Sequence, residues 1–344
     1  MKKWHLWTAA LTGIVVVAIM MAREFDWRAL ARMDMSWQFF SGVTLAVGCF
    51  VVQNLMLTLR FRHLTGNRLS VAQCFRIDAL CEFTSAATPS AVGGSSVAFV
   101  YLNREGVSMG RSIFTMFATL MADEAFLAVS CIAIYLIVPG NTLFCLGNMM
   151  DAGNAGDGTI LLRSGIRAVF LCSTGVVAVW TVILYYLLLH RPQAFGGFLK
   201  LCCKMPFINR FKAKAEKFGN EMTMASTEAR KERIGFWGKL AAYTSAAWMS
   251  RFATVLAILW AFDAHDNMLL AWFRQWVIWM ISIISPTPGG SGVAEIMFKI
   301  YYSDFMPEAS LAILAAMIWR MISYYPYLIM GVVVLPKWIR RNDD

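Results

Sequence analysis

The chain has 344 residues, of which 58% are hydrophobic and 15% are charged, and its formal net charge is +10. A soluble domain is about 45–50% apolar and about 25% charged, so this chain lacks the charge needed to cover a surface exposed to water. The composition excludes a soluble enzyme, a disordered chain and a fibrous protein, and it indicates an integral membrane protein. No nucleic-acid-binding module accompanies the basic excess, so nucleic acid is not an expected partner.

Six segments are apolar over about 20 residues, the length of helix that crosses a bilayer. The first, residues 4–22, is longer than the apolar region of a signal peptide and has no clean cleavage site, so we expect it to be retained. The other five are 37–59, 112–138, 165–189, 237–262 and 309–335. We therefore predict an all-α integral membrane protein with six full transmembrane helices in a single membrane domain, 1–344.

Two further segments, 69–102 and 268–302, are apolar but interrupted by Pro/Gly clusters. Basic residues gather in 190–239 and at both ends of the chain, whereas 139–160 and 263–267 carry acidic residues and no basic ones. Since Lys and Arg mark cytoplasmic loops, we expect a multi-pass protein of the plasma (inner) membrane with both termini cytoplasmic. Six spans fit this pattern only if each interrupted segment is a re-entrant broken-helix hairpin, the two entering from opposite faces.

The two interrupted segments share a series of short motifs in the same order. Phe-Arg comes first, then Thr-Pro, then Gly-Gly-Ser and Val-Ala. The similar spacing and the opposite directions of entry predict an inverted-topology repeat, with halves 1–160 and 161–344. The alternative is that both Pro/Gly clusters are plain surface loops between short helices.

A helix broken inside a membrane exposes backbone N–H and C=O groups, which bind ions and polar groups. Such backbone is tolerated only where protein or a water-filled cavity surrounds it, so two breaks that meet predict a polar cavity. Pro ends the incoming helix, and glycine allows a tight turn and a close approach. The candidate substrate-binding residues at the breaks are Thr88, Pro89, Gly93, Gly94 and Ser95 in the first, and Thr287, Pro288, Gly289, Gly290 and Gly292 in the second.

Charged residues at membrane depth are costly, so they usually face a cavity or a partner. The planar fork of arginine suits bidentate contact with phosphate or carboxylate. The candidates for lining a path for an anionic group are Arg76, Arg251, Arg274 and Arg320, with Glu124 and Glu295 as counter-charges or proton carriers. Asp78, Glu82 and Asp123 also lie at this depth. The alternative is that these charges form internal salt bridges between the two halves.

The basic segment 190–239 contains apolar residues at helical spacing, among them Phe207, Phe211, Phe218 and Met222. This spacing is typical of an amphipathic helix on the inner leaflet, where anionic lipids would bind it. A solvated connector between two halves is the alternative. The four histidines lie at predicted membrane edges, and no ATP-binding loop or metal-carboxylate cluster stands out, so we expect no catalytic residue, metal ion or cofactor.

The second break reads Pro-Thr-Pro-Gly-Gly-Ser-Gly-Val-Ala-Glu over 286–295, which resembles the PGG-x-G-x-x-E signature of the lysylphosphatidylglycerol synthase transmembrane-region family, also called flippase-like domain proteins. The first break, followed by Tyr101-Leu102 and Gly106-Val107, is similar to that family's first motif. The segment from Trp319 to Gly331 resembles its last helix. The likeness covers roughly residues 5 to 335.

The resemblance implies a protein that moves a lipid or a lipid-linked polar head group between leaflets; in the best-known members the lipid is an aminoacylated phosphatidylglycerol. Three departures bear on the substrate. Ser95 and Ala98 stand where many members have an acidic residue and an arginine, and Ala125 follows Glu124 where members often have an arginine. No aminoacyl-transferase domain follows residue 344, so we expect that this chain does not make that lipid itself.

We therefore predict a membrane lipid transporter or flippase, not an enzyme, with its polar cavity between the two hairpins. The expected partner is a membrane phospholipid or a lipid-linked anionic group, and assembly into a homo-oligomer stays open. One alternative is a membrane-embedded enzyme acting on a lipid-linked sugar or phosphate through Glu24, Asp26 or Asp34. A second alternative is a partner subunit that transports nothing itself.

Overall fold

The computed structural model describes residues 36–88, 93–146, 157–191, 193, 212–285, 287, 289–307 and 311–341, and every regular element in these ranges is helical. The all-α prediction is confirmed for this part of the chain. The predicted span 4–22 and the acidic residues Glu24, Asp26 and Asp34 lie outside the described residues.

Four segments of the described part are long and apolar enough to cross a membrane. They match four of the predicted spans: α3 (Trp37–Leu64), α6 (Met109–Ile137), α8 with the π-helical turn that follows it (Thr159–His190), and α14 with α15 (Leu311–Pro336). The predicted span 237–262 forms α11 (Ile234–Ala261), which carries Arg251 near its middle and lies outside this set of four. The structure thus shows several apolar helices of membrane-crossing length.

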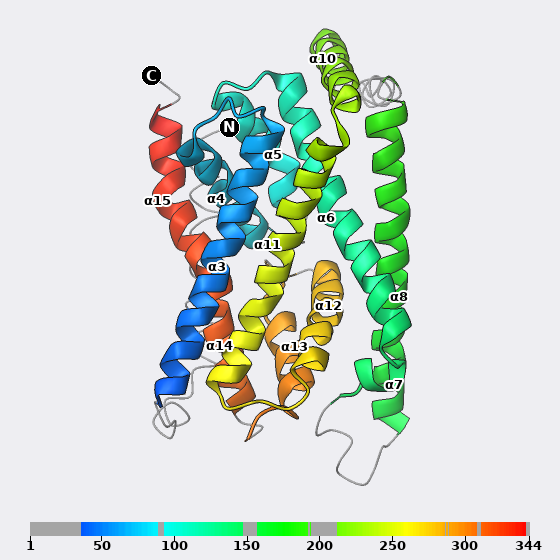
Figure 1. Ribbon diagram of the computed structural model, residues 1–344, viewed down its shortest axis with the longest axis vertical. Helices are drawn as coiled ribbons and strands as arrows, with labels where there is room; N and C mark the ends of the chain where they lie inside the picture. The colour runs from blue at the N-terminus through cyan, green and yellow to red at the C-terminus, as the bar shows by residue number, and fades with distance from the viewer. Residues whose placement is uncertain are drawn as a thin grey trace.

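Helices α3 and α11 form the central pair of the bundle and run side by side along most of its length (Figure 1). Each has 28 residues and, at about 1.5 Å per residue, is about 42 Å long. Helix α8 (Asp157–Tyr185) lies at one edge against α6, and the single turn α7 (Gly140–Leu143) lies beside their lower ends (Figure 1).

The two interrupted segments each fold as a pair of short helices. The first pair is α4 (Val71–Ala87) and α5 (Gly93–Arg104), and the second is α12 (Met268–Ile284) and α13 (Val293–Tyr302). The longest of these helices has 17 residues and reaches about 26 Å, less than the roughly 30 Å of a bilayer's hydrocarbon core. Figure 1 shows α4 and α5 in the upper half of the molecule and α12 and α13 in the lower half, so the two hairpins lie toward opposite ends of the bundle.

Local sequence explains where these helices begin and end. Ser70 caps α4 in a capping box with Gln73, and α4 ends at Thr88, directly before a proline, because the residue before proline disfavours the helical conformation. Helix α13 begins after Gly292, whose N–H donates to the Glu295 carboxylate at 2.6 Å. Local sequence therefore accounts for the end of α4 at the first break and for the start of α13 at the second.

The last predicted span, 309–335, is not one continuous helix. It divides at Tyr324 into α14 (Leu311–Ser323) and α15 (Tyr325–Arg341). Pro326 lies in the first turn of α15, where its missing N–H costs nothing, but its ring would clash with the carbonyl of a helix continuing from α14. Tyr324 lies at this junction, where its N–H still donates to the Arg320 carbonyl at 2.9 Å.

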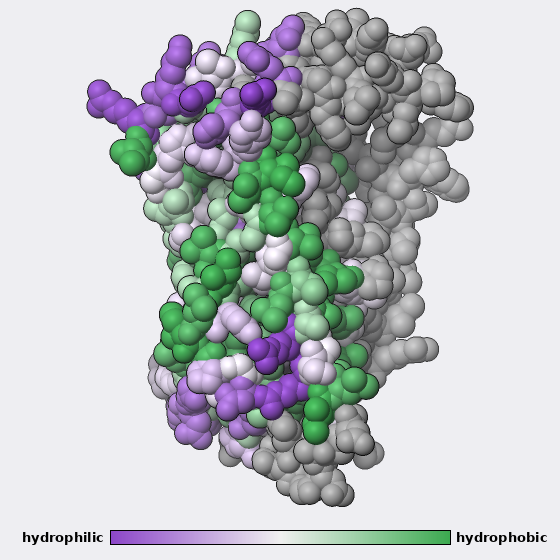
Figure 2. Space-filling model, turned by 90° about the vertical axis from the view of Figure 1, so that its right-hand side faces the viewer, coloured by the Kyte–Doolittle hydropathy of each residue, from purple (hydrophilic) through white to green (hydrophobic). Residues whose placement is uncertain are grey.

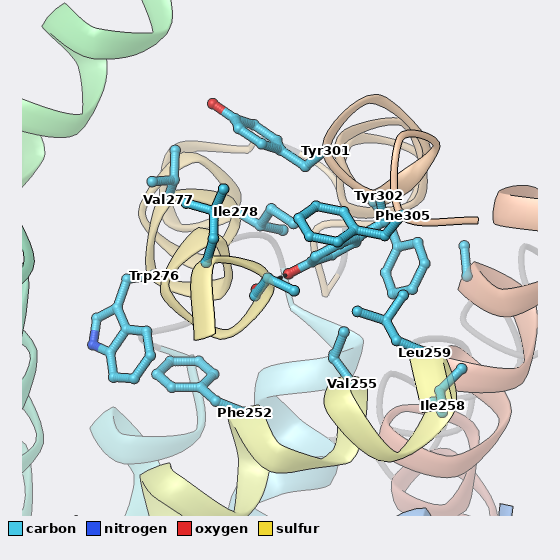
Figure 3. Packing of buried hydrophobic residues seen from close by; sticks show 14 of the residues in the cluster. Phe252, Val255, Ile258, Leu259, Trp276, Val277, Ile278, Tyr301, Tyr302 and Phe305 are labelled. Atoms are coloured by element: carbon cyan, nitrogen blue, oxygen red, sulfur yellow. Dashed lines mark hydrogen bonds between the residues drawn. The ribbon is translucent and has the colours of Figure 1, made fainter. Parts of the chain in front are cut away.

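The largest apolar core lies where α11 meets the second hairpin. Figure 3 shows the ring of Phe252 facing that of Trp276, with centroids 4.3 Å apart, and Tyr302 between the two arms of the hairpin. The Tyr302 hydroxyl accepts from Gln275 at 2.8 Å and donates to the Ala271 carbonyl at 2.9 Å. Aromatic contacts and a buried hydrogen-bond chain therefore join the second hairpin to α11 and its two arms to each other.

The outer face of the bundle is apolar between two polar ends. Figure 2 shows hydrophobic side chains over the middle of this face, with hydrophilic residues above and in a band below. On α8 the exposed side chains include Leu161, Val176, Val179 and Val182. An exposed apolar belt of this kind is expected of a protein whose solvent at this level is lipid.

Helix α10 (Lys212–Lys231) extends past the ends of the spanning helices at the top of the molecule (Figure 1). Its described side chains Met222, Ala225 and Ala229 are buried against α6 and its neighbours, not turned toward lipid. The Gly110 N–H donates to Glu221 at 3.0 Å, which ties α10 to the start of α6. Phe207 and Phe211 lie outside the described residues, and binding of the 190–239 segment to inner-leaflet lipids stays a prediction.

Candidate functional site

The two helix breaks, about 200 positions apart in the sequence, touch each other. The Gly289 N–H of the second break points to the carbonyl of Thr88 in the first, with N and O 3.4 Å apart. Tyr324 donates its hydroxyl to the Ala86 carbonyl at 3.0 Å. The breaks and the α14–α15 junction therefore form one unit in the middle of the bundle.

The second break requires glycine at three positions. Gly289, Gly290 and Gly292 have φ values of +57°, +68° and +84°, a region that L side chains rarely adopt. A Cβ atom on Gly289 would also collide with the ring of Tyr324. In the same break the Thr287 hydroxyl donates to the Ser291 carbonyl at 2.8 Å. The predicted Pro288 lies outside the described residues.

In the first break, glycine allows a close approach of the two arms. Gly94 lies near the start of α5, where its N–H donates to the Ser85 hydroxyl at 2.9 Å. A Cβ atom at this position would collide with the carbonyl of Cys81 on α4. Gly93 begins α5, whereas Pro89 and the side chain of Ser95 lie outside the described part.

A cavity of about 230 Å³ is lined by part of the second break and, on the side of the first break, by Ser85, Ala86 and Ala98, but not by Thr88, Gly93 or Gly94. It lies among α3, α4, α6, α11, α12, α14 and α15, and the backbone at Gly289 and Gly290 forms part of its wall. Aromatic side chains, three of them tryptophan, cover other parts of the wall. The charged residues that line it are Arg60, Asp78, Glu82, Asp123, Glu124, Arg251 and Arg320. Both halves of the chain thus contribute charge to one cavity.

Arg251 is one centre of the charged network. Its Nη2 donates to Glu82 on α4 at 2.7 Å, and its guanidinium lies 5.1 and 5.2 Å from the ring centroids of Trp248 and Trp279. With its amide carbonyl turned toward Arg251, Gln53 on α3 accepts from Nε at 3.1 Å and from Nη2 at 2.8 Å. Arg251 therefore joins α11 to both α3 and α4.

A second ion pair links α3 to α6. Arg60 lies 2.5 Å from Asp123, and the indole N–H of Trp248 donates to the same carboxylate oxygen at 2.8 Å. Thr244 on α11 is also within 3.4 Å of Arg60. The neighbouring Glu124 has a buried oxygen, Oε2, with no hydrogen-bond partner among the described residues.

The third arginine, Arg320, belongs to the second break. It pairs with Glu295 at 2.5 Å and donates to the Gly289 carbonyl at 3.0 Å, while its guanidinium lies 4.6 Å from the ring centroid of Tyr324. Glu295 in turn caps α13. Arg320 and Glu295 therefore fix the shape of the break on one side of the cavity.

Two arginines predicted to contact substrate lie outside the cavity lining. Arg76 pairs with Glu105 at the end of its own hairpin at 3.3 Å, and Arg274 pairs with Asp304 at 2.9 Å. These are the arginines of the repeated Phe-Arg motif, and each joins the first arm of its hairpin to the end of the second. Both are internal salt bridges, but each lies within one half of the chain, whereas the salt-bridge alternative of the sequence analysis expected bridges between the halves; Arg251–Glu82 is a pair of that kind.

Sequence reasoning missed Arg60 and Gln53. Arg60 lies one residue beyond the predicted span 37–59, whereas α3 continues to Leu64 and brings Arg60 into the cavity. Gln53 carries no charge and drew no attention. The described part of the chain contains no group of three His, Cys, Asp or Glu side chains placed to hold a metal ion.

The apolar belt, the helices of membrane-crossing length and the charged cavity among the helices define an integral, multi-pass membrane protein. Its sequence matches the family described as "Lysylphosphatidylglycerol synthase TM region" over residues 6–331, and the chain belongs to this family. The resemblance found in the motifs is thereby confirmed. The chain is also similar to a "UPF0104 membrane protein" of Archaeoglobus fulgidus, 26% identical over 341 residues and covering 94% of each chain. The family is linked to lipid handling in membranes.

Proposed function

We propose that this protein moves the polar head group of a phospholipid or lipid-linked molecule between leaflets, and that it is a transporter, not an enzyme. One observation carries the proposal: a charged and aromatic cavity lies against two touching helix breaks in a bundle whose outer face is apolar. A head group that crosses lipid unaided loses its hydration, and a polar path supplies replacement partners.

The cavity suits a phosphate-bearing head group. Arg251 and Arg320 both line the cavity, and the planar fork of arginine binds phosphate bidentately. Each arginine is held by one carboxylate, Glu82 or Glu295, which an entering phosphate would replace as the partner. The acyl chains would remain in lipid beside the apolar outer face.

The proposal includes the predicted topology of six spans, two re-entrant hairpins and cytoplasmic termini. The paired helices of the two halves have matching lengths: 28 residues in α3 and α11, and 17 in α4 and α12. Two such halves in opposite orientations could open the cavity alternately to each side, as inverted repeats do in other transporters.

The transport proposal is tested in proteoliposomes that hold a fluorescent phospholipid in both leaflets. An impermeant quencher reports how fast labelled lipid leaves the inner leaflet. Arg251→Ala and Arg320→Ala should each slow exchange by about tenfold or more, because a hydrogen bond to a charged group contributes about 1.5–3 kcal/mol. The matched control is Arg167→Ala on the outer face of α8, which should leave the rate unchanged. Exchange by wild type no faster than in empty vesicles would refute the function.

The topology is tested separately by labelling single cysteines with an impermeant reagent. Ser70→Cys lies at the start of α4 and Asp266→Cys lies directly before α12, so they report the outer ends of the two hairpins. We expect labelling of the two positions from opposite sides of the membrane. Labelling of both from one side would contradict the inverted arrangement.

A further inference from the structure

Five charged side chains from four helices meet on one side of the cavity, and their charges do not balance. This inner cluster consists of Arg60, Asp78, Glu82, Asp123 and Arg251. Arg60 pairs with Asp123 at 2.5 Å, and Arg251 pairs with Glu82 at 2.7 Å. The two cations are thus engaged by two carboxylates, and Asp78 remains as a third carboxylate without an arginine of its own.

Asp78 is the most buried carboxyl of the inner cluster. Only 2% of the residue is exposed, and its Oδ2 has no hydrogen-bond partner among the described residues. Glu82 on its own helix and Asp123 on α6 face it with like charge, while Arg60 on α3 and Arg251 on α11 face it with opposite charge. The neutral groups beside it are Cys81 and, from α15, Tyr327.

An ionised carboxylate in this position is costly. Burial removes its hydration, and the two arginines that could compensate for that loss already serve Asp123 and Glu82. A proton on Asp78 brings the formal charge of the inner cluster from −1 to 0. The protonated carboxyl also has an O–H group, which can donate a hydrogen bond to an anionic ligand in the cavity.

We propose that Asp78 is a proton-binding site and that its proton is coupled to the head-group movement proposed above. The carboxylate takes a proton from hydronium on the side to which the cavity is open, leaving water and a neutral carboxylic acid. It returns the proton to water on the other side, and no other bond forms or breaks. The coupling rests on the proposed function, whereas proton binding by Asp78 does not.

The coupling follows from the negative charge of the transported head group. With Asp78 ionised, the inner cluster carries a formal charge of −1 and repels a phosphate. With Asp78 protonated, the inner cluster is neutral and Arg251 can exchange Glu82 for the phosphate. Proton and anionic head group therefore enter together, and an inward proton gradient drives the head group in the same direction.

Proton binding is tested by infrared difference spectroscopy of the full-length protein between acidic and alkaline pH. We expect a carbonyl band of a protonated carboxylic acid that shifts when the aspartates are labelled with ¹³C at the carboxyl carbon. The label separates this band from that of Glu124, the other cavity carboxyl with an unpartnered oxygen. Asp78→Asn should remove the band, and the exposed control Asp266→Asn should keep it. Absence of a labelled band in wild type would overturn the proposal even if the variant failed to fold.

Coupling is tested in the lipid-exchange assay with and without a pH gradient. For one coupled proton, a gradient of one pH unit should bias the leaflet distribution of the lipid about tenfold in wild type and in Asp266→Asn. Asp78→Asn should exchange lipid with no response to the gradient. Exchange by wild type that ignores the gradient would refute the coupling while leaving the transport function standing. Loss of exchange in all variants and in wild type would refute the transport function, while the infrared result would still decide the proton site.

Discussion

The two hairpins have the same arrangement of helices, but the ion pair that joins the two arms is less exposed and makes more contacts in the second hairpin than in the first. In the first, Arg76 exposes 28% of its side chain and makes one contact with Glu105 at 3.3 Å. In the second, Arg274 exposes 2% and donates to both oxygens of Asp304 and to the Tyr301 carbonyl at 2.7 Å. The arginine of the repeated motif thus makes several buried contacts in the second hairpin and one partly exposed contact in the first. We infer that the second hairpin is the fixed frame of the cavity and the first is the part that yields.

The largest expected effect on stability is at the Arg274–Asp304 ion pair of the second hairpin. Arg274→Ala should lower the free energy of unfolding by about 3 kcal/mol, since removing one partner of a buried ion pair leaves the other uncompensated. Thermal unfolding in detergent, followed by tryptophan fluorescence, measures the loss. A variant as stable as wild type would show that the α12–α13 contact does not depend on this arginine.

The next effect tests the glycine break of the same hairpin. Gly289→Ala should cost about 2 kcal/mol, because alanine is strained at φ +57° and its Cβ would displace the Tyr324 ring. The matched control is Gly175→Ala on α8, where a Cβ meets no heavy atom within 4 Å and alanine favours the helix. The control should be neutral or slightly stabilising. If both substitutions had the same sign, left-handed backbone at Gly289 would be disproved.

The link between the hairpins comes third. Tyr324→Phe removes the hydroxyl that donates to Ala86 but keeps the ring against Gly289. Loss of this one hydrogen bond should cost about 1 kcal/mol. Native-state hydrogen exchange should show the loss as faster exchange in α4 and α5, with α12 and α13 unchanged. Equal acceleration in both hairpins would argue that they respond as one body.

The smallest effect on stability is expected at the Arg76–Glu105 ion pair of the first hairpin. Arg76→Ala should lower the free energy of unfolding by less than about 1 kcal/mol, because the pair is single-contact and partly exposed on the arginine side. Glu105 keeps two other donors, Gln73 and Trp338, each at 3.1 Å. Thermal unfolding, measured as for Arg274→Ala, compares the losses of stability in the two variants. Equal losses in the two variants would remove the distinction between a fixed and a yielding hairpin.

Much of the architecture could be read from the sequence. Hydropathy located the helices, because a lipid solvent demands about 20 apolar residues per crossing. The Thr-Pro and Gly-Gly motifs located both breaks, because proline and glycine limit or permit particular backbone angles locally. The sequence analysis did not predict the division of the last span at Tyr324, since the residues on both sides of Pro326 are mostly apolar.

Which arginines line the cavity could not be predicted from the sequence in the same way. Arg76, Arg274, Arg251 and Arg320 look alike in sequence, each an arginine in or beside an apolar run. In the structure the first two fasten hairpin ends and the other two face the cavity. Hydropathy indicates how deep in the membrane a residue lies. The direction in which its side chain points depends on how each helix is rotated against its neighbours.

The sequence by itself determined that this is a membrane protein of interrupted helices, because composition, apolar length and Pro/Gly breaks act through solvent and local backbone. Only the tertiary structure decided that Thr88 meets Gly289, that Arg60 joins the cavity, and that Oδ2 of Asp78 has no hydrogen-bond partner among the described residues. Those facts arise from packing among helices far apart in the chain. Long side chains pair with whatever that packing brings within reach, and no local rule fixes the partner.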